Sequence, residues 1–185
     1  MLQLLTYNSS AGLPHELASE IQAALLDQWP GPDMNDAEGP MIEPELHPTY
    51  FVLAAGGQLR SYARTIWAHV THRGKRLKLY GLGDVITLPE YRRRGYASRV
   101  VQAATAHIQS DPEADAALLI TESELGGLYR RSGWEYVREL RVESGEYEGQ
   151  EASDTCAMML FLSKAARCAR EGFASSLLVL PGDEW

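Results

Sequence analysis

The sequence lacks a cysteine framework, a metal-ligand cluster and a long apolar run. Its two cysteines, Cys156 and Cys168, belong to neither a CxxC pair nor a Cys/His cluster, so we expect no metal site. Isolated cysteines in a chain of 185 residues are typical of a reducing compartment and favour a cytoplasmic location. The N-terminal segment lacks a basic stretch followed by an apolar core, and the apolar run 156–162 is too short to span a bilayer. We therefore expect no signal peptide and no membrane partner.

Basic charge is also scarce. The chain carries 17 Lys and Arg against 25 Asp and Glu, which gives a formal net charge of -8. An acidic surface repels phosphate backbones, so a nucleic-acid partner is disfavoured. The same surface would attract a cationic small molecule such as a polyamine or an amino sugar, although acidity can equally serve solubility alone. The oligomeric state is not set by these features, and a homodimer is one of the states left open.

What is present is an ordinary globular composition, with 45% hydrophobic and 23% charged residues, and a length that fits one domain over residues 1–185. Apolar runs and helical spacing alternate without a regular βαβ order, which predicts an α+β fold with a central mixed sheet. The predicted strands are 2–7, 49–55, 59–70, 76–88, 116–120, 134–142, 158–162 and 174–180, and the predicted helices are 15–29, the later part of 91–110, and 124–131.

The most informative stretch is 84–97, where a β-branched strand leads through a turn and three arginines into a helix. Main-chain N–H groups at a helix start are unpaired and partly positive, so they suit a pyrophosphate. Gly95 would let the backbone approach that group closely. The arginines oppose the helix dipole at a cost of ~0.3–1 kcal/mol each, which favours a bound anion over a solvated basic face. Rival phosphate motifs are incomplete, because Gly81-Leu82-Gly83 lacks the third glycine of GxGxxG.

Arg92-x-x-Gly95-x-Ala97 resembles the [Q/R]-x-x-G-x-[G/A] signature of the GNAT superfamily of acetyl-CoA-dependent N-acetyltransferases. The resemblance implies a central mixed, mostly antiparallel twisted sheet flanked by helices. It also implies acetyl-CoA as co-substrate, with no metal. In that superfamily the loop holds the CoA pyrophosphate through backbone N–H groups, and the preceding strand binds the pantetheine and the thioester carbonyl. The residues that this implies for cofactor binding are Val85, Ile86, Thr87, Arg92, Arg93, Arg94, Gly95, Tyr96, Ala97 and Ser98.

A second motif, Leu128-Tyr129-Arg130-Arg131-Ser132-Gly133-Trp134, resembles the superfamily's LY-x-x-x-G-[FW] segment. That resemblance implies that Tyr129 protonates the departing CoA thiolate. A phenol with a pKa of about 10 can serve a thiolate whose conjugate acid has a pKa of about 8.5. A core tyrosine on an amphipathic helix is the alternative. Glu122 stands where the superfamily often has Asn, and we count it as a candidate substrate contact.

The attacking amine must lose a proton, because a free alkylamine has a pKa of about 10. Asp84 is the predicted base, directly or through a water, ahead of Glu122 and Glu124. The final segment 180–185 resembles the ends of aminoglycoside 2'-N-acetyltransferases, which implies that Asp183 and the Trp185 carboxylate contact a cationic amine. A packed tail without such a role is the alternative.

The sequence thus predicts an acetyl-CoA-dependent N-acetyltransferase that acylates a primary amine, aminoglycoside- or polyamine-like, by direct attack in a ternary complex. A covalent cysteine route is disfavoured, because neither cysteine has a histidine nearby in the sequence. Two alternatives stay open. One is an acyl-CoA-binding regulatory domain without turnover, and the other is a protein or peptide N-acetyltransferase.

Overall fold

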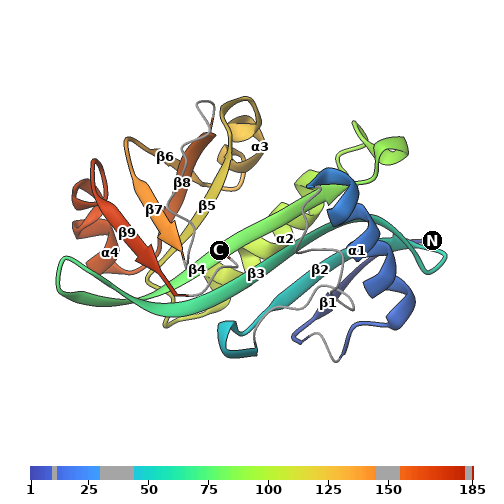
Figure 1. The fold of residues 1–185 in the computed structure, drawn as a ribbon, viewed down its shortest axis with the longest axis horizontal. Helices are drawn as coiled ribbons and strands as arrows, with labels where there is room; N and C mark the ends of the chain where they lie inside the picture. The colour runs from blue at the N-terminus through green and yellow to red at the C-terminus, as the bar shows by residue number, and fades with distance from the viewer. Residues whose placement is uncertain (10–11, 30–43, 145–154, 182–184) are drawn as a thin grey trace. The chain divides into compact units, whose positions relative to one another are not determined.

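The computed structural model describes residues 1–9, 12–29, 44–144, 155–181 and 185. Within these residues, seven strands form a mixed, mostly antiparallel sheet in the order β1-β2-β3-β4-β5-β8-β6, and helices flank it (Figure 1). This arrangement confirms the predicted α+β fold class. The strands of this sheet are β1 (Leu2–Tyr7), β2 (Thr49–Ala55), β3 (Gln58–His72), β4 (Lys75–Thr87), β5 (Ala116–Glu122), β8 (Thr155–Phe161) and β6 (Glu135–Val137).

The helices are α1 (His15–Gln28), α2 (Tyr96–Ser110), α3 (Gly126–Arg130) and α4 (Lys164–Cys168), with short 3-10 turns η3 (Pro44–Leu46), η4 (Pro89–Tyr91), η5 (Ser123–Leu125) and η6 (Arg170–Gly172). The predictions of α1, of α2 and of a short helix near 124–131 are confirmed. The sequence reasoning missed α4, although Ser163 before it is an ordinary N-cap residue. None of the helices in the described ranges combines the length and the apolarity needed to cross a membrane.

The described residues divide into two compact units, and the prediction of one domain stays a prediction. The first unit holds Met1–Thr65 and Asp84–Ala104. Its core forms where α1 places an apolar stripe at helical spacing against the buried faces of β2 and β3. The buried members of this core are Leu13, Leu17, Ile21, Leu25, Tyr50, Val52, Ala54, Leu59, Tyr62 and Ile86.

The second unit holds Ile66–Gly83 and Thr105–Trp185. In it β4 pairs in parallel with β5 over Leu79–Gly81, and β5 pairs antiparallel with β8 along its whole length. Trp134 is 1% exposed, and its indole Nε1 donates to Thr105 Oγ1 at 2.9 Å. A hydrogen-bonded tryptophan of this size anchors the packing of the unit, because both its apolar ring and its N–H group are satisfied.

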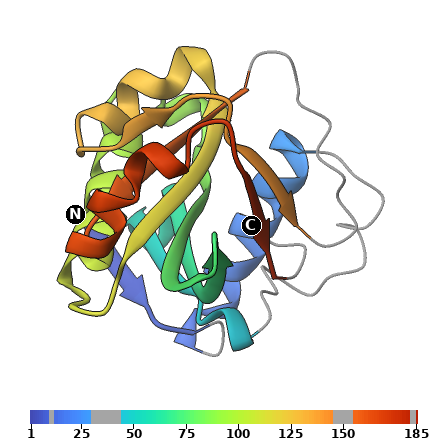
Figure 2. The ribbon, with the colours of Figure 1, turned by 90° about the vertical axis from the view of Figure 1, so that its left-hand side faces the viewer.

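The predicted strand 134–142 is wrong as a single element. After β6 the chain turns at Glu139, which has a left-handed φ of 54°, and it continues as β7 (Arg141–Ser144). The turn is held by Ser175, whose Oγ donates to Glu139 Oε2 at 2.7 Å and whose N–H donates to Arg138 O at 3.1 Å. As a result β7 pairs in parallel with β9 (Leu177–Leu180) in a separate sheet (Figure 2).

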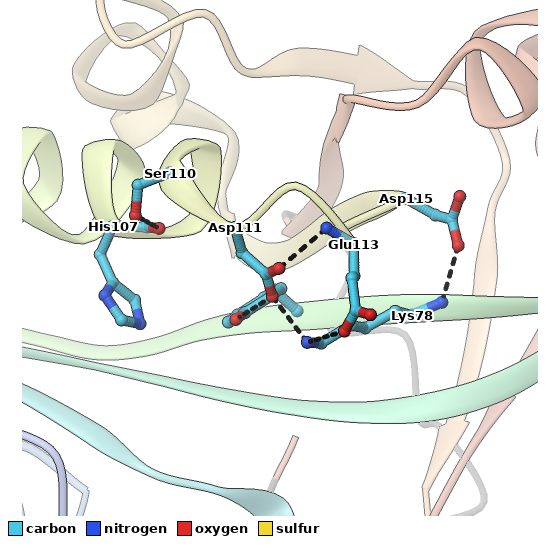
Figure 3. A network of polar contacts seen from close by, with 7 residues as sticks. Lys78, His107, Ser110, Asp111, Glu113 and Asp115 are labelled. Atoms are coloured by element: carbon cyan, nitrogen blue, oxygen red, sulfur yellow. Dashed lines mark hydrogen bonds and ion pairs between the residues drawn. The ribbon is translucent and has the colours of Figure 1, made fainter.

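A polar network ties β4 to the loop that follows α2 (Figure 3). Lys78 Nζ lies 2.7 Å from Asp111 Oδ2, the Tyr80 hydroxyl donates to the same oxygen at 2.8 Å, and Lys78 N–H donates to Asp115 at 3.0 Å. Partial burial raises the pKa of Asp111, but the hydrogen bonds from Lys78, Tyr80 and the backbone outweigh this effect and leave the pKa below its usual value. The network therefore favours a charged Asp111.

Candidate functional site

The loop between β4 and α2 turns left-handed twice within a few residues. Arg93 has a φ of 61° and Gly95 a φ of 76°, and α2 begins at Tyr96. A Cβ placed on Gly95 would meet nothing within 4 Å, so the space beside this residue is open. Turns that contain left-handed residues direct successive N–H groups toward one concave side, which is a recurrent anion-binding geometry.

The amides of this loop lack acceptors. In the part of the chain that the structure describes, the N–H groups from Arg93 to Ser98 donate no hydrogen bond. The backbone bonds stop with Arg92 N–H to Pro89 O at 3.3 Å and resume with Arg99 N–H to Gly95 O at 3.2 Å. No described side chain caps the start of α2, and the binding of a pyrophosphate there stays a prediction.

The three arginines of the loop differ in what they contact. Arg92 donates to Thr87 O at 3.1 Å and to Gln28 Oε1 at 3.2 Å, so it braces the loop against β4 and α1. Arg93 and Arg94 are exposed, and the Arg94 guanidinium lies 5.6 Å from the centre of the Tyr91 ring. Arg93 and Arg94 are therefore the side chains best placed to meet an anion in solution.

The last part of β4 is held by side chains of β3. Asp84 has a left-handed φ of 53° and forms an ion pair with Arg64 Nε. Ser61 Oγ lies 2.8 Å from Ile86 O, to which it donates, and 2.8 Å from Thr87 Oγ1. The role of Asp84 as the base stays a prediction, and the role of Val85, Ile86 and Thr87 in binding acyl-CoA does as well.

Tyr129 is 6% exposed and lies on α3 in the second unit. Burial raises the pKa of its phenol; a hydrogen bond with Thr121 lowers it in part, and nearby Cys156 raises it slightly. Thr121 and Cys156 are directly opposite each other in the β5–β8 pairing. Because the net shift is upward, the phenol keeps its proton at neutral pH, which a proton donor requires. Its role toward a thiolate stays a prediction.

The residues predicted to contact the substrate have different surroundings. Glu122 is exposed at the end of β5, whereas Asp183 lies outside the described residues. The Trp185 indole packs on Gly81: a Cβ placed there would lie 3.0 Å from Trp185 Cε3, and Trp185 Nε1 donates to Pro181 O at 2.6 Å. Glycine at position 81 thus makes room for the indole ring.

Sequence reasoning missed Arg64 and Ser61, although one signal was available for Arg64. The arginine stands in the apolar strand segment 62–66, and a charge in such a run needs a partner. For metals, the described ranges contain no group of three His, Cys, Asp or Glu side chains that could hold an ion.

Comparison with known proteins gives one family match. The family model described as acetyltransferase (GNAT) domain matches residues 17–137, which include Asp84, the loop 92–98 and Tyr129. Asp183 and Trp185 lie beyond the matched region. A sequence comparison with curated proteins found no match at the threshold used.

Solved structures share the fold. A GNAT family N-acetyltransferase from Escherichia coli in complex with CoA has a TM-score of 0.63 at 17% identity, over 97% of this chain and 90% of its own. A Bacillus subtilis acetyltransferase in complex with CoA has a TM-score of 0.56 at 15% identity, over 88% and 100%. A conserved Enterococcus faecalis protein has a TM-score of 0.56 at 18% identity, but the chain spans only 33% of that protein's length.

Proposed function

This chain belongs to the GNAT acetyltransferase family, and we propose that it transfers the acetyl group of acetyl-CoA to a primary amine of a cationic small molecule. One observation carries the acetyl-CoA part of this proposal. The amides from Arg93 to Ser98 have no acceptor among the described residues, and exposed Arg93 and Arg94 lie beside them. A diphosphate supplies the acceptors and the charge that this arrangement lacks. The CoA complexes of the Escherichia coli and Bacillus subtilis proteins support the same assignment.

The proposed reaction is a direct attack of the amine on the thioester carbonyl. A C–N bond forms, the C–S bond breaks, and the CoA thiolate takes a proton while the amine loses one. Asp84 would accept the amine proton, directly or through a water, because its side chain is 23% exposed and can therefore be reached from solution. Tyr129, with its raised pKa, would donate to the thiolate.

The acceptor class rests on charge. The chain has a formal net charge of -8, and the exposed Glu122 and Glu124 stand at the end of β5. Such carboxylates attract polyamines and amino sugars. We extend the proposal to aminoglycoside-like acceptors, with Asp183 and the Trp185 carboxylate as contacts, and to a cytoplasmic location, which the two isolated cysteines favour.

Titration calorimetry with CoA and acetyl-CoA tests the first half of the proposal. We expect binding that weakens as salt is added, because phosphate charge is part of the contact. No binding heat with either ligand, at several temperatures, would remove acyl-CoA from the proposal.

A thiol-release assay tests the second half. The acceptors would be aminoglycosides, polyamines, and peptides with a free N-terminus or lysine. We expect CoA release with amino sugars or polyamines. Turnover with peptides alone would refute the small-cation class, and CoA binding without turnover on any amine would point instead to a regulatory acyl-CoA domain.

A further inference from the structure

Asp84 has an unusual backbone for a strand residue. In the described part of the chain, the other non-glycine residues with positive φ are His47, Arg73, Arg93, Glu139 and Ser175, and all of them lie in turns or loops. Asp84 alone lies inside a strand. A left-handed residue interrupts the extended course of a strand and changes the direction of the residues that follow. Such a conformation persists only where its surroundings hold it.

Two side chains of β3 stabilise the backbone conformation at Asp84 and in the residues that follow. Arg64 is 8% exposed and pairs with the Asp84 carboxylate across the strands. Three residues earlier, Ser61 donates to the Ile86 carbonyl and contacts the Thr87 hydroxyl. β3 therefore holds both ends of the segment 84–87 through side chains, in addition to its place beside β4 in the sheet.

The geometry points to Arg64 as a positioning residue for acyl transfer. With Ser61, Arg64 fixes the main-chain course of 84–87, and this course sets how the main chain meets the thioester carbonyl. The inference rests on the proposed function, because only that function places a thioester beside this segment. The inference goes beyond the proposed function because it assigns the alignment of the main chain with the thioester carbonyl to a side chain of β3. Arg64 acts through its ion pair with Asp84 rather than by contact with the amine or the thioester.

The neighbouring Tyr62 offers a matched control. Its side chain is fully buried in the core of the first unit, and its hydroxyl has no hydrogen-bond partner among the described residues. Tyr62→Phe therefore removes a buried polar atom beside Arg64 without removing a contact to β4. A general disturbance of the packing around β3 would appear in both variants, whereas loss of the contact to Asp84 would appear only in Arg64→Met.

The test compares Arg64→Met, Asp84→Asn and Tyr62→Phe with the wild type. We expect Arg64→Met to lower kcat by ~10- to 100-fold, since a misplacement of about 1 Å costs this much, while the Kd for CoA changes less than ~3-fold. Tyr62→Phe should keep kcat within about twofold. Asn tolerates a left-handed φ and its side-chain oxygen still accepts from Arg64, so Asp84→Asn should keep this backbone conformation. A large loss of kcat in Asp84→Asn with unchanged exchange at 84–87 would then report the base role alone.

Amide hydrogen exchange at 84–87 gives a readout that needs no turnover. We expect faster exchange there in Arg64→Met and unchanged exchange in Tyr62→Phe. If Arg64→Met does not fold, the double variant Arg64→Met/Asp84→Asn, which removes both charges, takes its place in the exchange measurement, and its kcat is compared with that of Asp84→Asn. Unchanged exchange and an unchanged kcat would overturn the inference. A wild type that neither binds CoA nor turns over would instead overturn the proposed function, and exchange alone would then decide whether Arg64 holds the segment.

Discussion

The N-termini of α4 and α2 differ in whether a side chain of the protein accepts hydrogen bonds from their first amides. At α4 the N-cap Ser163 accepts from Ala166 N–H at 3.0 Å, so the protein satisfies the helix start itself. At α2 no described side chain accepts from the amides of Arg93 to Ser98, and arginines stand where a dipole would favour acids. An N-cap contributes about 0.5–2 kcal/mol, so α2 forgoes a stabilisation that α4 has.

Helix length and packing explain why α2, unlike α4, is stable without an N-cap. α4 has 5 residues and depends on its cap, because so short a helix has little propagation to offset its nucleation. α2 has 15 residues and buries Val100, Val101, Ala104 and Ile108 at helical spacing, so packing holds it without a cap. Packing thus leaves the start of α2 free to bind an anion.

The largest expected effect separates binding at α2 from chemistry at Tyr129. In Tyr129→Phe we expect kcat to fall by roughly 100-fold, as for loss of a proton donor, with the Kd for CoA unchanged. Because the pKa of Tyr129 is raised, the wild type should show no loss of kcat from this group below about pH 10. Steady-state kinetics across pH give the comparison, with the exposed Tyr136→Phe as control. An unchanged kcat would leave Tyr129 as a core residue only.

Closing the start of α2 should weaken CoA binding most among the loop variants. Aspartate tolerates a left-handed φ, and in Gly95→Asp its carboxylate can take the free amides and repel a diphosphate. We expect about 100-fold weaker CoA binding, which is roughly 2.8 kcal/mol at 1.4 kcal/mol per decade. Gly57→Asp is the control, because Gly57 has a similar φ of 80° and equally open surroundings. Equal CoA affinity in both variants would contradict the proposal that the amides at the start of α2 bind CoA.

Removing one exposed arginine should have a smaller effect. We expect Arg94→Gln to weaken CoA binding about 3- to 5-fold and to reduce its dependence on salt, since one charge-assisted contact is lost. Arg76→Gln removes an equally exposed arginine at the start of β4 and should leave the Kd unchanged. Titrations at two ionic strengths measure both quantities. A salt dependence identical to that of the wild type would argue against contact between Arg94 and phosphate.

The cap of α4 should affect stability alone. Ser163→Ala is expected to lower the free energy of unfolding by about 1 kcal/mol. For a chain of this length that corresponds to a Tm lower by roughly 2–4 °C. CoA affinity should not change, because α2 does not depend on this cap. Calorimetric melts with and without CoA provide the measurement, and a loss of CoA affinity would contradict the separation of the two helix starts.

Local chemistry was enough to predict much of the fold and the loop. Most of the predicted strands, and α1 and α2 with their helical spacing, lie where the sequence places them, whereas the predicted strand 134–142 does not. Gly95 was identified because it lets the backbone approach an anion closely, and the space beside it is open. These features depend on neighbours along the chain, and for that reason a single sequence shows them.

Features that depend on distant partners were not predictable in the same way. The break at Glu139 has no glycine or proline, and its turn is held by Ser175, 36 residues later. Asp84, the partner of Arg64, lies 20 residues away on the next strand. The Trp185 ring packs against Gly81, which is also distant in the sequence. The residues next to Glu139, Arg64 and Trp185 in the sequence do not identify their distant partners. The sequence could therefore indicate that Arg64 needs a partner, but not which residue it is.

The β3–β4 hairpin has a consequence for the order of folding. Its turn places Arg73 and Gly74 at φ of 49° and 75°, which suits the twist of two long strands. Ser61, Arg64 and the segment 84–87 all belong to this one hairpin, so their contacts close over short loops and should form early. During synthesis the hairpin can assemble while β8 is still inside the ribosome. Pulse-labelled exchange that protects β8 before β4 would contradict this order.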